Sequence, residues 1–153
     1  MDANVTIRKA KSNDVPAMAG LLAELFAIED DFIIDRDKQI RGLQLLLQYQ
    51  GSIIVVAEIS NRVIGMISMQ SLISTAMGER VGLIEDMIVS HEYRGIGVGR
   101  LLLGSMIEHA HILGYGRIAL GADKRNISAI TFYQKFEFEM NNMGLMYYLP
   151  RAP

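Results

Sequence analysis

Residues 94–100 read R-G-I-G-V-G-R, and their types and spacing are the best suited to chemistry in this chain. They follow a strand-like run at 83–89 and lead into an apolar helical pattern. The first N–H groups of a helix have no partner inside the helix, and the helix dipole favours negative charge there. Glycine brings the backbone close to a ligand, and arginine adds charge-assisted hydrogen bonds. The pattern predicts a site for a phosphate-bearing ligand. The alternative is a glycine-rich turn before a core helix.

The glycine spacing narrows the kind of phosphate ligand. It differs from the dinucleotide pattern G-x-G-x-x-G, and the chain holds no G-x-x-x-x-G-K-[ST] loop. A generic nucleotide-binding α/β domain is further disfavoured by the hairpins expected before the loop.

Composition limits the remaining choices. Half of the 153 residues are hydrophobic, which suits one domain over residues 1–153, and no apolar run approaches the ~20 residues that cross a bilayer. The polar start of the chain argues against a secretory signal, so we expect a cytoplasmic protein. The absence of cysteine and the spacing of the three histidines predict no metal site. A net charge of -2 argues against nucleic acid as a partner.

Hydrophobic periodicity predicts the elements that must position the loop. Asp14 is expected to cap the first helix, and a turn at 60–62 to join two strands. The order is β-α-α-β-β-β-α-β-α-β-β, which implies an α/β fold with a mixed sheet covered by helices. The expected strands are 5–10, 53–59, 63–69, 81–89, 117–120, 138–140 and 145–149.

Two motifs in this order resemble the GNAT N-acetyltransferases across essentially the whole chain. The first is R-x-x-G-x-G at 94–99, and the second is N-x-x-A-x-x-F-Y-x-K-x-x-F at 126–138. The resemblance implies the GNAT acyl-CoA N-acyltransferase fold with a splayed central sheet. It also implies acetyl-CoA as co-substrate and transfer of its acetyl group to a primary amine by direct attack in a ternary complex.

The resemblance assigns the coenzyme to one strand end, the loop and one asparagine. A bulge in the strand at 81–89 would leave backbone N–H groups free, with Met87 donating to the thioester carbonyl and Val89 contacting the pantetheine arm. Both are otherwise ordinary buried strand residues. Asn126 would contact the pantetheine arm, act as a helix cap, or do both. The expected coenzyme-binding residues are Met87, Ile88, Val89, Arg94, Gly95, Ile96, Gly97, Val98, Gly99, Arg100, Asn126 and Tyr133.

Two side chains are implied for proton transfer. Tyr133 matches the family tyrosine that protonates the departing thiolate, and a phenol with pKa near ~10 suits that task. Its alternative is a core aromatic beside Phe132. Glu85 resembles the glutamate that lines the substrate site of polyamine acetyltransferases, as base relay or amine ligand. Its alternative is a solvated strand-end charge. Glu137 departs from the family pattern, because glycine usually stands at this helix end and Glu137 would be strained there.

The acceptor is the least determined part. The I-E-D-M-I-V run at 84–89 favours a small cationic amine, and the acidic residues 29–31 would attract it unless they form only a solvated surface. An amino acid, a protein N-terminus or a lysine side chain remain alternatives, as does a non-catalytic coenzyme A-binding regulatory module. The methionine- and tyrosine-rich C-terminal segment 140–148 suggests a homodimer, unless its methionines fill the core.

Overall fold

A mixed sheet of five strands, in the order β1-β2-β3-β4-β5, organises the first of two compact units, Met1–Gly121 and Ala122–Pro153. The computed structural model describes residues 4–29 and 33–150. Neighbouring strands are antiparallel except β4 and β5, which are parallel. The strands are β1 Thr6–Lys9, β2 Ser52–Ile59, β3 Arg62–Ser74, β4 Glu79–Val89 and β5 Ile118–Leu120. The predicted mixed sheet is confirmed, whereas a single domain over 1–153 stays a prediction.

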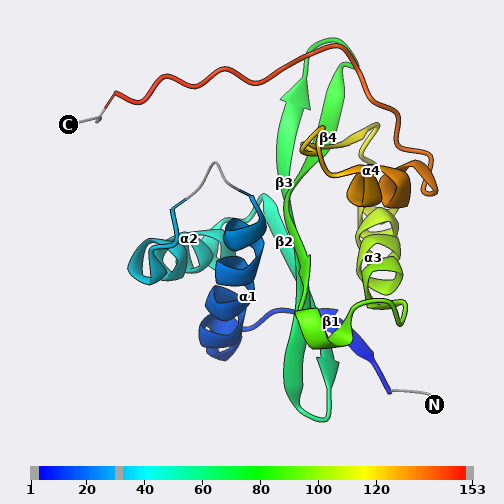
Figure 1. The fold of residues 1–153 in the computed structure, drawn as a ribbon. Helices are drawn as coiled ribbons and strands as arrows, with labels where there is room; N and C mark the ends of the chain where they lie inside the picture. Colours follow the sequence, from blue (N-terminus) through cyan, green and yellow to red (C-terminus); the bar gives the residue numbers. More distant parts are fainter. Residues whose placement is uncertain (1–3, 30–32, 151–153) are drawn as a thin grey trace. The chain divides into compact units, whose positions relative to one another are not determined.

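Helices cover both faces of this sheet (Figure 1). α1 (Val15–Ile28) and α2 (Arg36–Gln48) lie on one face, where their buried side chains pack with strand residues such as Ile54, Met66 and Ile88. α3 (Val98–Leu113) packs on the other face, so close to β3 that a Cβ on Gly65 would lie 3.0 Å from Leu102 Cδ1. The strand β4 therefore has helices on either side, and successive residues along it serve different layers.

The first of the two hairpin turns agrees with the sequence prediction, and the second differs from it. Ser60 and Asn61 have φ of 49° and 63°, the left-handed conformation of a two-residue hairpin turn between β2 and β3. The next hairpin is longer than expected, because β3 continues to Ser74 before β4 begins at Glu79.

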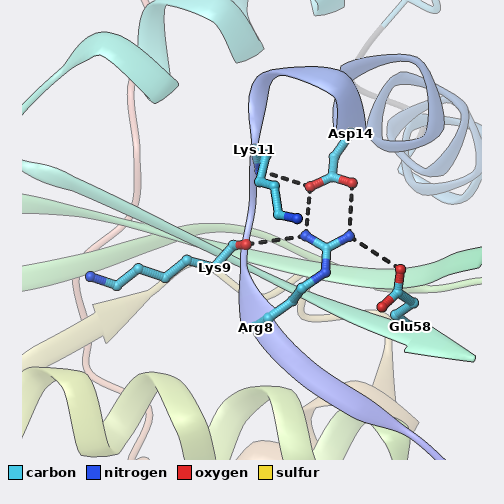
Figure 2. A network of polar contacts seen from close by, with 5 residues as sticks. All are labelled: Arg8, Lys9, Lys11, Asp14 and Glu58. Atoms are coloured by element: carbon cyan, nitrogen blue, oxygen red, sulfur yellow. Dashed lines mark hydrogen bonds and ion pairs between the residues drawn. The ribbon is translucent and has the colours of Figure 1, made fainter. Parts of the chain in front are cut away.

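A partly buried ion pair joins the start of the sheet to the start of α1 (Figure 2). The guanidinium of Arg8 donates to both oxygens of Asp14 at 2.8 and 2.9 Å, and to Glu58 on β2 at 3.4 Å. Asp14 also accepts from the N–H of Lys11 at 2.7 Å. The hydrogen bond from Arg8 is the largest cause that lowers the pKa of Asp14. Asp14 stands at the predicted cap position, but its carboxylate binds Arg8 and Lys11 in place of the first helical N–H groups.

The second unit contains α4 (Ile127–Gln134) and an extended segment after it. Asn126 caps α4, since its Oδ1 accepts from the N–H of Ala129 at 3.1 Å. The two strands predicted at 138–140 and 145–149 are wrong, because neither segment forms a ladder in the structure as described through residue 150. The N–H of Phe138 closes the end of α4 by donating to the carbonyl of Tyr133, so it is taken from any ladder. The residues from Leu145 to Leu149 are all exposed, and a strand without a partner is not stable.

Candidate functional site

The glycine loop forms a tight, exposed turn at the start of α3. Gly95 and Gly97 have φ of 78° and 92°, values that residues with a Cβ rarely adopt. Gly97 is the residue that caps α3, and the buried Val98 anchors the first turn. At the glycines the surface of the loop is therefore backbone, beside the exposed side chain of Ile96, and the N–H groups of the first helical turn have no partner within the helix. Such a surface can bind an anionic group.

Side chains tie the loop to the rest of the first unit. The Nε of Arg94 donates to the carbonyl of Val89 at 2.9 Å, which fixes the loop to the end of β4. The N–H of His91, at the beginning of the same connection, donates to Glu24 of α1 at 3.0 Å. Arg100 is exposed in the first turn of α3. Arg94 is thus partly a positioning residue, and Arg100 is accessible to a ligand.

Strand β4 carries a bulge where the sequence predicts one. Met69 on β3 pairs with Ile84, the adjacent Ser68 pairs with Asp86, and Glu85 is the extra residue between them. On its other edge β4 pairs with β5 only over Gly82–Ile84. Within the described ranges no strand pairs with this edge of β4 beyond the bulge, although the side chain of Arg94 binds the carbonyl of Val89 at its end. We call this strand-free stretch the open edge.

The open edge presents two peptide N–H groups. The N–H of Asp86 and that of Ser90 both donate towards β3, at 3.2 and 2.7 Å. Because N–H groups alternate in direction along a strand, those of Met87 and Val89 point to the opposite edge. These are the two residues expected to donate to a thioester and its pantetheine arm. The intervening Ile88 is buried against α1 and α2.

Asp86 lies on the face of β4 that α1 and α2 cover. Its carboxylate accepts from the hydroxyl of Ser68 at 3.1 Å. Burial, which disfavours the charged form, raises the pKa of Asp86 to about 6; the nearby Glu85 also raises it, whereas the hydrogen bond from Ser68 lowers it. A carboxyl group with this pKa is suited to accept a proton near neutral pH.

A pocket of about 670 Å³ opens beside this carboxylate. Its walls come from α1 and α2, and β3 and β4 contribute one residue each. Asp86 is among the residues that line it, whereas the exposed Glu85 is not. The lining residues are Leu22, Phe26, Lys38, Gln39, Gly42, Leu43, Leu45, Leu46, Tyr49, Gln70 and Asp86.

Sequence reasoning included Asp86 only within the I-E-D-M-I-V run at 84–89, gave it no role of its own and missed the pocket. One signal was available, because Gly42 stands inside an otherwise strong helical pattern, where glycine costs ~1 kcal/mol relative to alanine. In the structure a Cβ on Gly42 would meet nothing within 4 Å, so this glycine leaves space beside the pocket.

The other two predicted site residues belong to the second unit. Tyr133 is half-buried on α4, with its ring 5.4 Å from that of Phe132 and 6.0 Å from that of Phe138. Asn126 is confirmed as the helix cap. Glu137 takes φ of 70°, so it occupies the strained position that the sequence identifies.

No group of three or more His, Asp or Glu side chains that could hold a metal ion occurs among residues 4–29 and 33–150. None of the helices in the described part of the chain is long and apolar enough to cross a membrane. The acidic residues 30 and 31 lie outside the described residues.

Comparison with known proteins identifies the family. Residues 22–138 match the model of the acetyltransferase (GNAT) family. This chain belongs to the GNAT family. The match runs from α1 to the end of α4 and so spans both compact units.

Relatives and solved structures agree with this membership. An uncharacterised N-acetyltransferase of Methanocaldococcus jannaschii is 25% identical over 88% of this chain. The matched part spans 60% of that protein's length. The spermine/spermidine N(1)-acetyltransferase of Bacillus subtilis is 34% identical over a shorter match. That match covers 38% of this chain and 39% of the relative's length. A transcriptional regulator from Bacillus halodurans superposes with a TM-score of 0.84, 25% identity and coverage of 95% and 100% of the two chains. The aminoglycoside N-acetyltransferase AAC(6')-Iy in complex with CoA superposes with a TM-score of 0.81 and 17% identity. The superposition covers 99% of this chain and 98% of that protein. The predicted GNAT fold is confirmed.

Proposed function

We propose that this GNAT protein transfers the acetyl group of acetyl-CoA to a primary amine by direct attack within a ternary complex. One observation carries the proposal. Around the bulge at Glu85, β4 offers the N–H of Met87 on an open edge and the carboxylate of Asp86 in a pocket. Acyl transfer needs a donor for the carbonyl oxygen and an acceptor for the proton of the amine. Consecutive residues supply both.

The loop holds the coenzyme through its backbone. The N–H groups of the first turn of α3 bind the pyrophosphate, and the positive φ of Gly95 and Gly97 keeps the approach free of side chains. Arg100 adds a charge-assisted contact. The remaining predicted contacts in this segment are those of Arg94, Ile96, Val98 and Gly99. The coenzyme supplies the acetyl group as an activated thioester.

The open edge of β4 orients the thioester. The N–H of Met87 donates to its carbonyl oxygen, and a single donor of this kind can contribute ~3 kcal/mol to the stability of the transition state. The N–H of Val89 binds the pantetheine arm, and the buried Ile88 keeps the two donors in place by anchoring the strand to the core.

Asp86 accepts the proton of the amine. With a pKa near ~10.4, only about one primary alkylamine in 2,500 is neutral at pH 7, so a base is needed. The pocket favours Asp86 over Glu85, because the carboxylate of Asp86 lines the space and Glu85 is exposed. Glu85 stays a prediction as a relay that passes the proton from Asp86 to water.

Tyr133 protonates the leaving group, as the family resemblance implies. Asp86 takes one proton from the ammonium and releases it to water, so its carboxylate is ionised again before attack. Attack of the neutral amine then forms the C–N bond and breaks the C–S bond; the second proton lost from the nitrogen passes to Asp86, and a phenol proton passes to the thiolate. Tyr133 then recovers its proton from solvent. The aromatic contacts with Phe132 and Phe138 fix its ring on α4, and the acid role itself rests on the family resemblance. Asn126 adds a contact to the pantetheine arm through the amide nitrogen that its cap does not use.

A small cationic amine is the acceptor class that relatives support, since one is a spermine/spermidine acetyltransferase and a fold neighbour is an aminoglycoside acetyltransferase. The exposed apolar side chains from Leu145 to Leu149 support a homodimer, which size-exclusion chromatography with light scattering would test. A cytoplasmic location also stays a prediction.

The test is thiol release from acetyl-CoA against amines, amino acids, amino sugars and peptides, with Tyr133→Phe and Asp86→Asn beside the wild type. We expect turnover that falls at least tenfold in Tyr133→Phe and further in Asp86→Asn. Turnover unchanged in Tyr133→Phe would remove the acid role while the enzyme class remains. Tight coenzyme binding without turnover of any acceptor would favour the regulatory module.

A further inference from the structure

The pocket beside Asp86 has mostly apolar walls. Leucine and aromatic side chains supply most of its lining, from α1 through Leu22 and Phe26 and from α2 through Leu43 and Leu46. A volume of about 670 Å³ lies within the range of ~300–1,000 Å³ typical of pockets for whole small molecules. The space therefore suits the body of an acceptor and exceeds what its amino group alone requires.

Charge is unevenly distributed over this lining. Among the described residues that line it, Asp86 is the one anionic residue, and the only other ionisable side chains are Lys38, which is cationic, and the phenol of Tyr49. One ammonium group can pair with Asp86. A second ammonium held inside the pocket would meet apolar wall, where an unpaired charge is costly. Near the mouth it would meet the like charge of Lys38, whose repulsion is modest because Lys38 is exposed to solvent.

Neutral hydrogen-bonding capacity is also present. Gln39 and Gln70 both line the pocket, and the Oε1 of Gln39 is buried with no partner within the described ranges. Such an amide can bind a neutral polar group on the acceptor without bringing in another charge. The polar groups thus fit an amine that carries a single cation.

We propose that the preferred acceptor is a monoamine with an apolar body, such as an alkylamine or arylalkylamine, whose ammonium binds Asp86 and whose hydrocarbon fills the pocket formed by α1 and α2. This inference rests on the proposed function for its catalytic consequence. It differs from the polyamine class named for the Bacillus subtilis relative.

Hexylamine and 1,6-diaminohexane form the sharpest test, because they share a carbon chain and differ by one ammonium group. Calorimetric titration of the protein saturated with coenzyme A should give a Kd for hexylamine at least tenfold lower than that for the diamine. The same order is expected in kcat/KM when acetyl-CoA is supplied. Equal binding, or tighter binding of the diamine, would overturn the inference.

Variants of α2 test whether the pocket is the binding place. Gly42→Leu places its Cβ where no atom lies within 4 Å, and the rest of the side chain should occupy the pocket that Gly42 lines and raise the Kd for hexylamine at least tenfold. Gly20→Leu is the matched control, because Gly20 is a mid-helix glycine with equally open surroundings and does not line the pocket. An unchanged Kd in Gly42→Leu would exclude this pocket.

Lys38→Ala tests the charge argument. Removing this cation should lower the Kd for the diamine two- to threefold and leave that for hexylamine unchanged, with Arg41→Ala, an exposed cation of α2 outside the lining, as control. A diamine affinity that does not respond would remove Lys38 from the explanation of selectivity.

The two proposals fail in different ways. Selective binding of hexylamine without acetylation would sink the proposed function and leave the pocket assignment. Acetylation with preference for the diamine would do the reverse. If neither amine bound nor reacted, the inference would be wrong, and turnover of any acceptor in the wider panel would show that the proposed function stands without it.

Discussion

The glycine loop follows the end of β4, and the pocket lies beside Asp86 on the same strand. The two regions nevertheless differ in whether backbone or side chains form their surface. The loop exposes backbone, shaped by the positive φ of Gly95 and Gly97. The pocket exposes side chains contributed by two helices and two strands, with one buried carboxylate. Backbone binding depends on a local pattern of a few residues, whereas a side-chain pocket depends on long-range packing. The two regions should therefore respond differently to substitution.

The largest effect is expected in the pocket. Asp86→Asn keeps the shape and the hydrogen bond from Ser68 but cannot accept a proton, so kcat/KM should fall ~10²–10⁴-fold, the usual range for a general base. Glu85→Gln should cost less than tenfold. Steady-state kinetics from pH 5 to 9 provides a second readout, since the wild-type kcat/KM should rise through pH 6 with the ionisation of Asp86, which Asn cannot undergo. Equal losses in both variants would contradict the assignment of Asp86.

The same substitution should make the protein more stable. Folding raises the pKa of Asp86 from 3.8 to about 6, so the folded state binds more protons than the unfolded state between these pH values. Its contribution to stability therefore falls as pH rises from about 4 to 6. Above pH 7 Asp86→Asn should gain up to ~3 kcal/mol in the free energy of unfolding.

Urea denaturation at pH 4 and pH 8 would measure this gain. The advantage of Asp86→Asn should be present at pH 8 and nearly absent below pH 4, where the carboxyl group is protonated in both states. An advantage of the same size at both pH values would show that burial of this charge is not its cause.

In the loop, the effect should appear in coenzyme binding. Gly97→Val places a branched side chain on a backbone with φ of 92° at the start of α3, so it strains the turn and covers the N–H groups. We expect acetyl-CoA affinity to fall ~100-fold by calorimetry, with hexylamine binding to the protein without coenzyme retained. Gly104→Ala, a glycine inside α3 without positive φ, is the control. Simultaneous loss of both ligands would break the distinction between the two regions.

The smallest effect concerns the end of α4. Glu137 has φ of 70°, where glycine is unstrained, so Glu137→Gly should stabilise the protein by up to ~1 kcal/mol. Thermal denaturation would show a rise in Tm of a few degrees at most. A lower Tm would mean that the side chain of Glu137 contributes more than its backbone strain costs.

The sequence was sufficient where local rules decide the structure. The turn at Ser60 and Asn61, the cap at Asn126 and the strain at Glu137 all follow from the preferences of single residues. The bulge in β4 followed from the family resemblance. The turn, the cap and the strained position each need no more than a few neighbouring residues, whereas the bulge also depends on pairing with β3.

The remaining features depend on packing between distant segments. Alternation along a strand could not identify Asp86 as the pocket residue, because the extra residue at Glu85 interrupts that alternation. The pocket itself requires α1 and α2 to meet the sheet. The strands expected at 138–140 and 145–149 failed for a related reason, since an apolar run becomes a strand only when another backbone is available to pair with it.

The bulge has one more consequence, which concerns chain length. Residue 85 is unpaired whichever amino acid stands there, so replacing its side chain leaves the irregularity in β4 intact. Deleting the residue would restore regular pairing with β3 and straighten the strand, because bulges bend the strand that carries them. β5 would then be able to continue its pairing past Ile84 and occupy the N–H of Met87. The end of pairing between the two parallel strands thus depends on the number of residues in β4. An alanine scan changes side chains but not this number, so it would not detect the effect.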